Sequence, residues 1–330
     1  MEWLYIYLPF ADINVFIPAL LLIGFSVGVI SSFFGIGGAW MVTPGLNILG
    51  FPMAYAIGTD MAHIAGKSVF ATIQHSKFGN VDYKLGFVML LGTIAGIEGG
   101  AQVIMHLEKL FIINTVVRWV YAIFLLIIAL VMFYDYFKQK NSKDSKQGIQ
   151  WYKKFQKLPI PPFVHFKVAN VTCSLWLPVI VGLITGFLAG FLGIGGGLFR
   201  LPALIYCVGC PVIVAVGTDL FEVMISGFYG GFSYSMKGRV DFIAVGIMLL
   251  GAVLGTRIGA VATKYVDSSK IRMSFATAVL GCFVSILLKI FNYKISSAIL
   301  IFSTIGLICL QIIYIFIKNH LLKKKAVKYQ

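Results

Sequence analysis

The sequence predicts an all-α polytopic membrane protein. Of its 330 residues, 59% are hydrophobic and only 12% are charged. Soluble domains carry about 25% charged residues, so this chain has too few charges to cover a water-facing surface. Apolar stretches of membrane length also recur along the whole chain. These observations exclude a cytosolic enzyme, a secreted disulfide scaffold and a disordered regulator.

Nine apolar stretches are long enough to cross a bilayer, which needs about 20 helical residues. They lie at residues 15–34, 53–75, 84–105, 115–137, 175–192, 211–236, 241–263, 271–291 and 295–317. Two shorter stretches, 39–50 and 197–209, follow glycine clusters and cannot span alone. The pattern predicts about eight to nine membrane segments, and the stretch at 295–317 is an extra C-terminal transmembrane helix.

The excess positive charge lies mostly outside the apolar stretches. The formal net charge is +15, and lysines gather in a linker at 138–174 and in the tail after residue 317. Because Lys- and Arg-rich loops stay inside, we expect both segments to be cytoplasmic and the chain to be a multi-pass protein of the cytoplasmic membrane. We expect no nucleic-acid partner, since no basic face on a soluble fold is available. The five cysteines lie in or beside apolar stretches and predict no disulfide framework.

The strongest feature is an internal repeat. The cluster at 35–38 (GIGG) recurs at 193–196 (GIGG), and Gly58-Thr59-Asp60 recurs as Gly217-Thr218-Asp219. Glycines spaced by four residues recur as well, and we expect them to form packing faces; they are Gly92, Gly96 and Gly100, and Gly251, Gly255 and Gly259. The chain therefore divides into a first membrane repeat (1–137), a basic linker (138–174), a second membrane repeat (175–291), and the extra helix with its basic tail (292–330).

The two repeats are predicted to be inverted relative to each other. If each glycine-broken segment is re-entrant, each repeat crosses the membrane three times and the second begins on the opposite side. This arrangement places most Lys and Arg residues, including the basic tail, on the linker side. Fully spanning broken segments would leave the tail outside, against the positive-inside rule.

The glycine clusters predict helices that are broken within the membrane. Unwound backbone is tolerated there only where it is buried or lines a cavity. A half-helix that begins after a break directs free N–H groups and partial positive charge toward an anion. Paired breaks thus indicate a binding site, with tight packing as the alternative. The glycines concerned are Gly35, Gly37, Gly38, Gly193, Gly195, Gly196 and Gly197.

Charged residues inside apolar stretches are expensive in lipid and indicate function. Arg200 comes in the first turn after the second glycine cluster, where the helix dipole repels a cation. A bound anion would relieve this conflict by pairing with the guanidinium, and Lys67 is a weaker candidate for the same role. The alternative is that Arg200 snorkels or pairs with a carboxylate.

Two pairs of ionisable residues lie at matching positions of the repeats. Asp60 and His63 match Asp219 and Glu222, and each pair shares one helix face. Each pair can relay a proton or bind a coupling ion; helix capping with a satisfied buried pair is the alternative. Separately, Glu98 and Arg257 occupy equivalent positions and are predicted to form a structural ion pair. The alternative is direct contact of Arg257 with the substrate.

The sequence predicts no enzyme, cofactor or metal site. Cys207 and Cys210 form a CxxC pair, but no second pair offers four zinc ligands. The chain contains no nucleophile elbow or P-loop, and the glycine cluster at 35–38 lacks the strand context of a dinucleotide site.

The glycine clusters, the Gly-Thr-Asp motifs and the Gly-x-Val-Asp loops that end in Asp82 and Asp241 resemble the TauE/SafE sulfite exporter family over residues 15–291. The resemblance implies a secondary transporter for a small sulfur-containing anion, such as sulfite or a sulfonate. Its partners would be this anion, the lipid bilayer and a coupling ion, either a proton or sodium. In this interpretation Arg200 supplies positive charge, and the residues that donate hydrogen bonds are Thr59 and Thr218. Asp60 or Asp219 carries the coupling proton, and one repeat rocks against the other in alternating access.

The two glycine clusters differ in one respect. Ala39 and Trp40 follow the first cluster, and Val42 stands where the second repeat has Arg200. A single site centred on the second repeat is therefore expected. Two alternatives stay open. One is a cation or metal permease that uses Asp60, His63, Asp219 and Glu222. The other is a non-transporting membrane partner.

Overall fold

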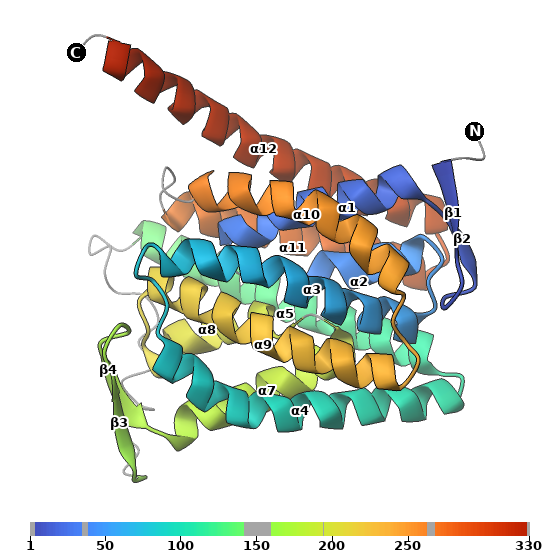
Figure 1. Cartoon of the computed structure of the whole chain (residues 1–330), viewed down its shortest axis with the longest axis horizontal. Coiled ribbons are helices and arrows are strands. Elements are labelled where there is room, and N and C mark those ends of the chain that lie inside the picture. The colour runs from blue at the N-terminus through green and yellow to red at the C-terminus, as the bar shows by residue number, and fades with distance from the viewer. Residues whose placement is uncertain (1–3, 35–38, 142–159, 194, 263–267, 329–330) are drawn as a thin grey trace.

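The structure, a computed structural model, describes residues 4–34, 39–141, 160–193, 195–262 and 268–328. The chain forms a bundle of helices with one short hairpin at each end (Figure 1). The helices are α1 (Ile17–Phe34), α2 (Ala39–Ile48), α3 (Met53–Ser76), α4 (Tyr83–Lys109), α5 (Ile113–Asn141), α7 (Trp176–Leu192), α8 (Gly197–Ala203), α9 (Val212–Met236), α10 (Phe242–Ala262), α11 (Ser268–Ile290) and α12 (Lys294–Lys328), and a π-helical turn, η2 (Leu204–Val208), follows α8.

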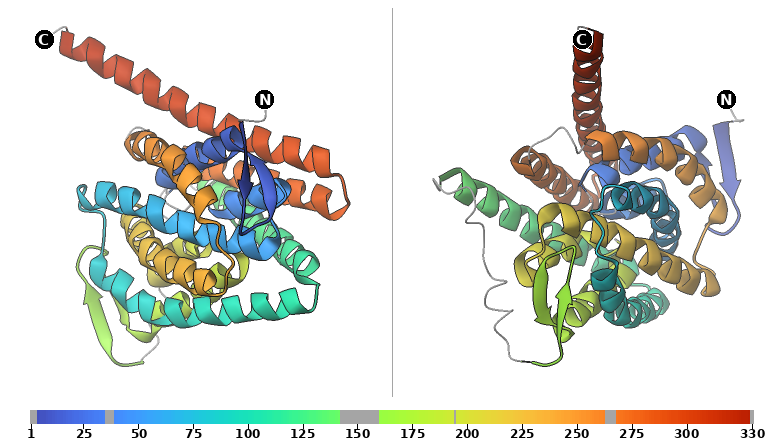
Figure 2. Two further views of the ribbon diagram at one scale, coloured as in Figure 1. Left: turned by 45° about the vertical axis from the view of Figure 1, so that its right-hand side comes forward. Right: turned by 60° about the vertical axis from the view of Figure 1, so that its left-hand side comes forward.

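Six of the described helices, α1, α4, α5, α9, α10 and α12, are long and apolar enough to cross a membrane. The polytopic helical fold is confirmed, whereas the count of eight to nine segments stays a prediction. The central helix α3 is 24 residues long, but Asp60, His63 and Lys67 lower its hydropathy. The last part of α12 extends beyond the bundle (Figures 1 and 2).

Two β-hairpins lie at opposite ends of the bundle (Figure 1). One pairs β1 (Tyr5–Leu8) with β2 (Ile13–Phe16), and the other pairs β3 (Phe163–Phe166) with β4 (Val171–Ser174). Their turns contain Asp12 and Asn170 at φ 53° and 50°, a left-handed conformation that short polar side chains tolerate. The sequence did not predict these strands, because four alternating residues are too short a signal beside long apolar runs.

A proline or an aspartate directly precedes four of the helices. Pro52 and Pro211 directly precede α3 and α9. Asp82 accepts a hydrogen bond from the backbone N–H of Leu85 (3.1 Å), and Asp241 accepts one from that of Ala244 (3.0 Å). These two carboxylates satisfy N–H groups that have no partner inside their helices. Both aspartates are therefore helix-cap residues.

Helices α3 and α9 lie side by side at the centre of the bundle and run antiparallel (Figure 1). Thr59, near the start of α3, accepts a hydrogen bond from the backbone N–H of Asp241, which follows α9 (3.0 Å). Thr218, near the start of α9, accepts one from the backbone N–H of Asp82, which follows α3 (2.9 Å). At each end of the α3–α9 pair, a hydrogen bond thus joins two segments that are distant in sequence.

Two further helix pairs pack through glycine. A Cβ on Gly96 of α4 would lie 2.3 Å from the carbonyl oxygen of Leu183 in α7, and a Cβ on Gly255 of α10 would lie 2.2 Å from that of Phe25 in α1. Only glycine permits so close an approach of two backbones. The predicted packing role of both glycine series is confirmed, since their other members make similar contacts.

The directions of the helices show whether each glycine-broken segment crosses the bundle or returns to the end where it began. Gly24 of α1 meets Met248 and Gly28 meets Ala252, so α1 runs parallel to α10. Helix α10 follows α9 after a short loop and runs antiparallel to it, as α3 does. Thus α1 and α3 begin at the same end of the bundle, and α2 brings the chain back to that end. The glycine contacts between α4 and α7 show in the same way that these two helices run parallel. Helices α7 and α9 therefore begin together at the opposite end of the bundle, and α8 brings the chain back to that end.

This is the chain direction that re-entrant segments and inverted repeats require, although the duplication itself stays a prediction. The division at 1–137 and 175–291 also stays a prediction. In space the two parts interleave, because α1 packs on α10, α4 packs on α7, and α5 packs on α11.

Candidate functional site

The second glycine break shapes the backbone around Arg200. Gly193, Gly195 and Gly196 have φ of 74°, 64° and 78°, which only glycine adopts readily. Helix α8 then begins at Gly197 and carries Arg200 in its first turn. A Cβ on Gly196 would lie 2.5 Å from Nη2 of Arg200, so the guanidinium occupies space that a larger residue would fill.

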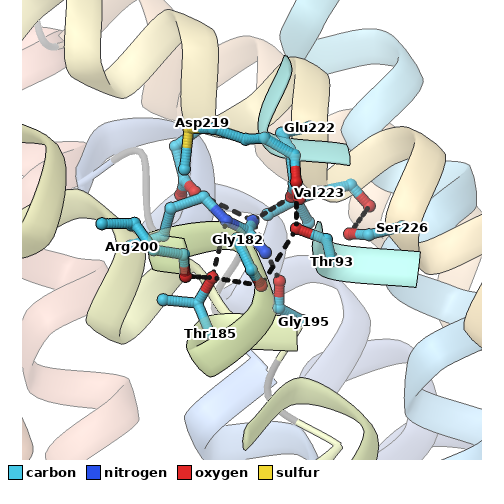
Figure 3. A network of polar contacts seen from close by, with 11 residues as sticks. Thr93, Gly182, Thr185, Gly195, Arg200, Asp219, Glu222, Val223 and Ser226 are labelled. Atoms are coloured by element: carbon cyan, nitrogen blue, oxygen red, sulfur yellow. Dashed lines mark hydrogen bonds and ion pairs between the residues drawn. The ribbon is translucent and has the colours of Figure 1, made fainter. Parts of the chain in front are cut away.

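Arg200 is fully buried and lies between two carboxylates of α9 (Figure 3). Its Nη1 is 3.1 Å from Oδ1 of Asp219, and it also forms an ion pair with Glu222. Both acids are fully buried and lie three residues apart on one helix face. The alternative in which Arg200 pairs with a carboxylate is therefore what the structure shows.

Neutral groups complete the surroundings of the guanidinium. Nε of Arg200 donates to Oγ1 of Thr185 (3.3 Å), and Nη1 donates to the carbonyl oxygen of Gly195 (3.3 Å) (Figure 3). Thr185 in turn donates to the carbonyl oxygen of Val181 in α7 (2.8 Å). Thr185 was not predicted as a site residue, because an uncharged hydroxyl in an apolar helix is an ordinary feature of membrane segments.

Arg200, Asp219 and Glu222 form a triad in which some buried polar atoms make no hydrogen bond. Within the described part of the chain, Nη2 of Arg200 and Oδ2 of Asp219 are buried and have no hydrogen-bond partner. A buried polar atom without a partner is unfavourable, and in a native protein it commonly marks a place for water, an ion or a ligand. The triad has one guanidinium for two carboxylates, so it can accept a proton.

A second polar cluster lies on α3. Asp60, His63 and Lys67 are fully buried and share one helix face. Oγ1 of Thr43 in α2 donates to Oδ2 of Asp60 (2.8 Å), and Nδ1 of His63 is 3.8 Å from Oδ1 of Asp60. Thr43 was also not predicted, for the same reason as Thr185. Oδ1 of Asp60 and both ring nitrogens of His63 have no hydrogen-bond partner among the described residues.

The second glycine break lies between these clusters. A Cβ on Gly193 would lie 2.8 Å from Oγ1 of Thr43, the partner of Asp60. A Cβ on Gly195 would lie 3.1 Å from a methyl carbon of Ile64 in α3 and 3.4 Å from one of Val223 in α9. The predicted site residues of the two repeats are thus brought to the same region of the bundle. Gly35, Gly37 and Gly38 lie outside the described residues.

The hydroxyls of Thr59 and Thr218, which were predicted to donate hydrogen bonds to a substrate, have a structural role. Thr59 and Thr218 are fully buried, and each oxygen accepts a backbone hydrogen bond across the α3–α9 pair. Hydrogen-bond donation by these hydroxyls to a substrate stays a prediction.

The predicted ion pair between Glu98 and Arg257 is wrong. Oε1 of Glu98 is 3.0 Å from Nζ of Lys237, and Oε2 accepts a hydrogen bond from Ser233 (2.6 Å). Arg257 is exposed on α10. The reason is that α4 packs on α7 and α9, whereas α10 packs on α1 and α3, so equivalent positions do not face each other.

The described residues contain no group of three or more His, Cys, Asp or Glu side chains that could hold a metal ion. The cysteines are free thiols, and Cys210 is buried. The candidate site consists of buried charged side chains, those of the triad and of Asp60 with His63, beside the second glycine break. Intramembrane charges of this kind mark substrate and ion pathways.

Comparison with known proteins identifies the family of the chain. The family model described as "Sulfite exporter TauE/SafE" matches residues 20–287. The chain belongs to the TauE/SafE family. It is 28% identical to the probable membrane transporter protein YunE of Bacillus subtilis over 273 residues, covering 80% of this chain and 95% of YunE. A probable membrane transporter protein of Haemophilus influenzae is 26% identical over 302 residues, covering 83% of this chain and 99% of that protein. No solved structure matches significantly. The chain is therefore a multi-pass membrane transporter of this family.

Proposed function

We propose that this TauE/SafE transporter moves a small sulfur-containing anion across the cell membrane by proton-coupled alternating access. Arg200 binds the anion, and Asp219 and Glu222 carry the coupling proton. The observation that supports this is the fully buried triad, in which one guanidinium faces two carboxylates.

The charge of the triad gives the coupling. With both acids ionised the triad has an excess negative charge, which repels an anion strongly in a medium of low dielectric constant. Protonation of one acid makes the triad neutral, and protonation of both leaves the guanidinium free to pair with the anion. Proton binding and anion binding therefore favour each other, and thermodynamic linkage makes this effect reciprocal.

The chemistry of the site suits a small oxyanion. A guanidinium binds oxyanions through two parallel N–H groups, and Nη2 of Arg200 has no partner among the described residues. The choice of a sulfur anion rests on the description of the family as sulfite exporters. In this proposal Asp60 and His63 form a second proton-carrying pair, and Lys67 is an auxiliary cation. The linker and the C-terminal tail face the cytoplasm.

Thermal stabilisation of the purified protein tests the proposal. A ligand that binds only the folded state raises its apparent stability. Sulfite, sulfate, thiosulfate, a sulfonate and divalent metals are compared at pH 6 and pH 8, for wild type, Arg200→Gln and Arg257→Gln. We expect one sulfur anion to stabilise wild type and the Arg257→Gln control more at pH 6, with no effect on Arg200→Gln. An anion effect that survives in Arg200→Gln would contradict the role of Arg200.

A cation permease is the second candidate, and the excess of carboxylates over cations around Arg200 favours it. It predicts stabilisation by a divalent metal alone, more strongly at pH 8, where protons compete less for the carboxylates. The same experiment therefore separates the two candidates.

A further inference from the structure

The two β-hairpins occupy matching positions in the two halves of the sequence. They are related by the same offset of 158 residues that relates the two glycine clusters. The pairing register agrees, because the pair of Tyr5 with Phe16 in the first hairpin corresponds to that of Phe163 with Ser174 in the second. The residue with a positive φ also stands at the corresponding place in each turn. The same structural unit therefore occurs at both ends of the bundle (Figure 1).

Each hairpin immediately precedes a helix and lies at the level of a membrane surface. Strand β2 ends at Phe16, and α1 begins at Ile17. The 18 residues of α1 span about 27 Å, which matches a hydrocarbon core about 30 Å thick. The hairpin before α1 therefore lies at the depth of the lipid headgroups. Both hairpins also run across the helix ends and not along the bundle, so that they follow the membrane surface (Figures 1 and 2).

The outer face of the β1–β2 hairpin is aromatic. Leu8 and Val15 are buried in the core of the bundle, whereas Tyr5 and Tyr7 are each 55% exposed. Phe10, in the turn, is exposed as well. The outer face of an antiparallel sheet that borders water is commonly polar. Amphipathic aromatic side chains are instead enriched where a membrane meets water, so this face suits the headgroup layer.

The surroundings of the β3–β4 hairpin are basic. Lys167, in its turn, is exposed, and Nζ of Lys84, at the start of α4, donates to the backbone oxygen of His165 (3.3 Å). Neither lysine forms an ion pair with a carboxylate that the structure describes. The neighbouring carboxylate of Asp82 is buried and accepts from the backbone of the hairpin turn. Two exposed positive charges therefore remain at this end of the bundle.

A lipid surface fits this basic region better than a second copy of the chain. In a symmetric contact between two β3–β4 hairpins, Lys84 and Lys167 would meet the same cations of the other copy, and like charges repel. Headgroup phosphates at the same depth offer the oxyanions that ammonium groups bind. The charge thus matches an anionic lipid.

We propose that the two hairpins are anchors in the headgroup layers of opposite leaflets, and that the β3–β4 hairpin binds anionic headgroups through Lys84 and Lys167. The β1–β2 hairpin is held by its aromatic face, since Asp12 is the only charged residue between positions 4 and 16. Because the β3–β4 turn is bonded to Asp82 at the start of α4, headgroup binding there fixes the depth of α4 in the membrane. Anionic lipid therefore acts on one end of the bundle.

Fluorescence quenching in liposomes measures the depth of each hairpin. Asn14→Cys and Thr172→Cys are matching, exposed positions of the two hairpins, and each carries an NBD fluorophore. Labelled wild type is the blank for the native cysteines, four of which are buried. We expect phosphatidylcholine with a nitroxide on its headgroup to quench both labels more than lipid with a nitroxide at carbon 12 of a chain. Leu254→Cys, at an exposed position within α10, should show the reverse order.

The charge preference is measured at Thr172→Cys with spin-labelled phosphatidylglycerol and phosphatidylcholine at equal mole fractions. We expect phosphatidylglycerol to associate about fivefold more at low salt, and the preference to weaken at 1 M salt because of screening. Lys84→Gln with Lys167→Gln should remove the preference. Lys109→Gln removes an exposed positive charge at the opposite end of the bundle and should leave it intact.

Three results would overturn the proposal. Quenching of the labels by aqueous iodide, with no effect of either lipid quencher, would place the hairpins in water. Protection from both kinds of quencher would indicate a protein contact, such as a second copy of the chain. A phosphatidylglycerol preference that persists in the double variant would contradict the role of the lysines. If Thr172→Cys does not fold, as judged by size-exclusion chromatography, Val168→Cys offers an exposed position in the same hairpin.

Discussion

Asp82 and Thr218 are 136 residues apart in sequence and are joined by a hydrogen bond of 2.9 Å, in which the backbone N–H of Asp82 donates. Asp82 also accepts hydrogen bonds from the backbone N–H groups of Leu85, Val168 and Ala169. One buried residue therefore caps α4, fixes the turn of the second hairpin and attaches both to the start of α9. The equivalent bond between Asp241 and Thr59 holds the opposite end of the central pair.

Replacing Thr218 by valine tests this attachment. Thr218→Val keeps the shape but leaves the buried N–H of Asp82 without an acceptor, which costs about 1–3 kcal/mol. We expect the same for Thr59→Val. Thermal unfolding in detergent measures the effect. Thr304→Val is the control, because Thr304 is partly exposed and donates only to the backbone of its own helix. A control that is as destabilised as Thr218→Val would contradict the assigned role.

Gly96→Ala should separate α4 from α7. The added Cβ would lie 2.3 Å from a backbone oxygen, which cannot rotate away, so we expect a loss of about 1–3 kcal/mol. Gly246→Ala is the matched control in α10, where a Cβ meets nothing within 4 Å. There alanine should stabilise the helix by up to about 1 kcal/mol. Unfolding curves of the two variants should shift in opposite directions.

The triad allows stability to be separated from anion binding. Arg200→Gln leaves two buried carboxylates without their cation, and we expect a loss of about 3–5 kcal/mol. Adding Asp219→Asn and Glu222→Gln removes the uncompensated charges and should restore much of the stability. The triple variant should still show no stabilisation by sulfur anions. If it does bind such an anion, Arg200 is not the binding group.

A double-mutant cycle checks the ion pair of Glu98. Because both partners are partly exposed, with side chains 23% and 33% accessible, the coupling between Glu98→Gln and Lys237→Gln should be about 0.2–1 kcal/mol. Glu98→Gln and Arg257→Gln should be additive, since Arg257 is exposed on a helix that does not face Glu98. A measurable coupling with Arg257 would contradict the arrangement of α4 and α10.

Composition and periodicity predicted the polytopic helices and the packing role of Gly96 and Gly255, because both depend on local sequence. The charges of Arg200, Asp219 and Glu222 marked a candidate site, because ionisable residues are conspicuous in apolar segments. Pairing across the bundle could not be predicted in the same way. The error over Glu98 arose because equivalent positions in a repeat need not face each other. Thr43 and Thr185 carry no charge, so only the packing of α2 and α7 shows their contacts.

The glycine contacts between α1 and α10 and between α4 and α7, together with the two threonine bonds of the α3–α9 pair, restrict how this transporter can move. Each of these contacts joins residues before the linker to residues after it. A rigid-body rotation of residues 1–137 against 175–291 would separate all three helix pairs at once. If transport follows the alternating access proposed above, the moving surface passes between helix pairs and not between the two repeats, against the expectation that one repeat rocks against the other. Each moving body then contains helices from both halves of the sequence.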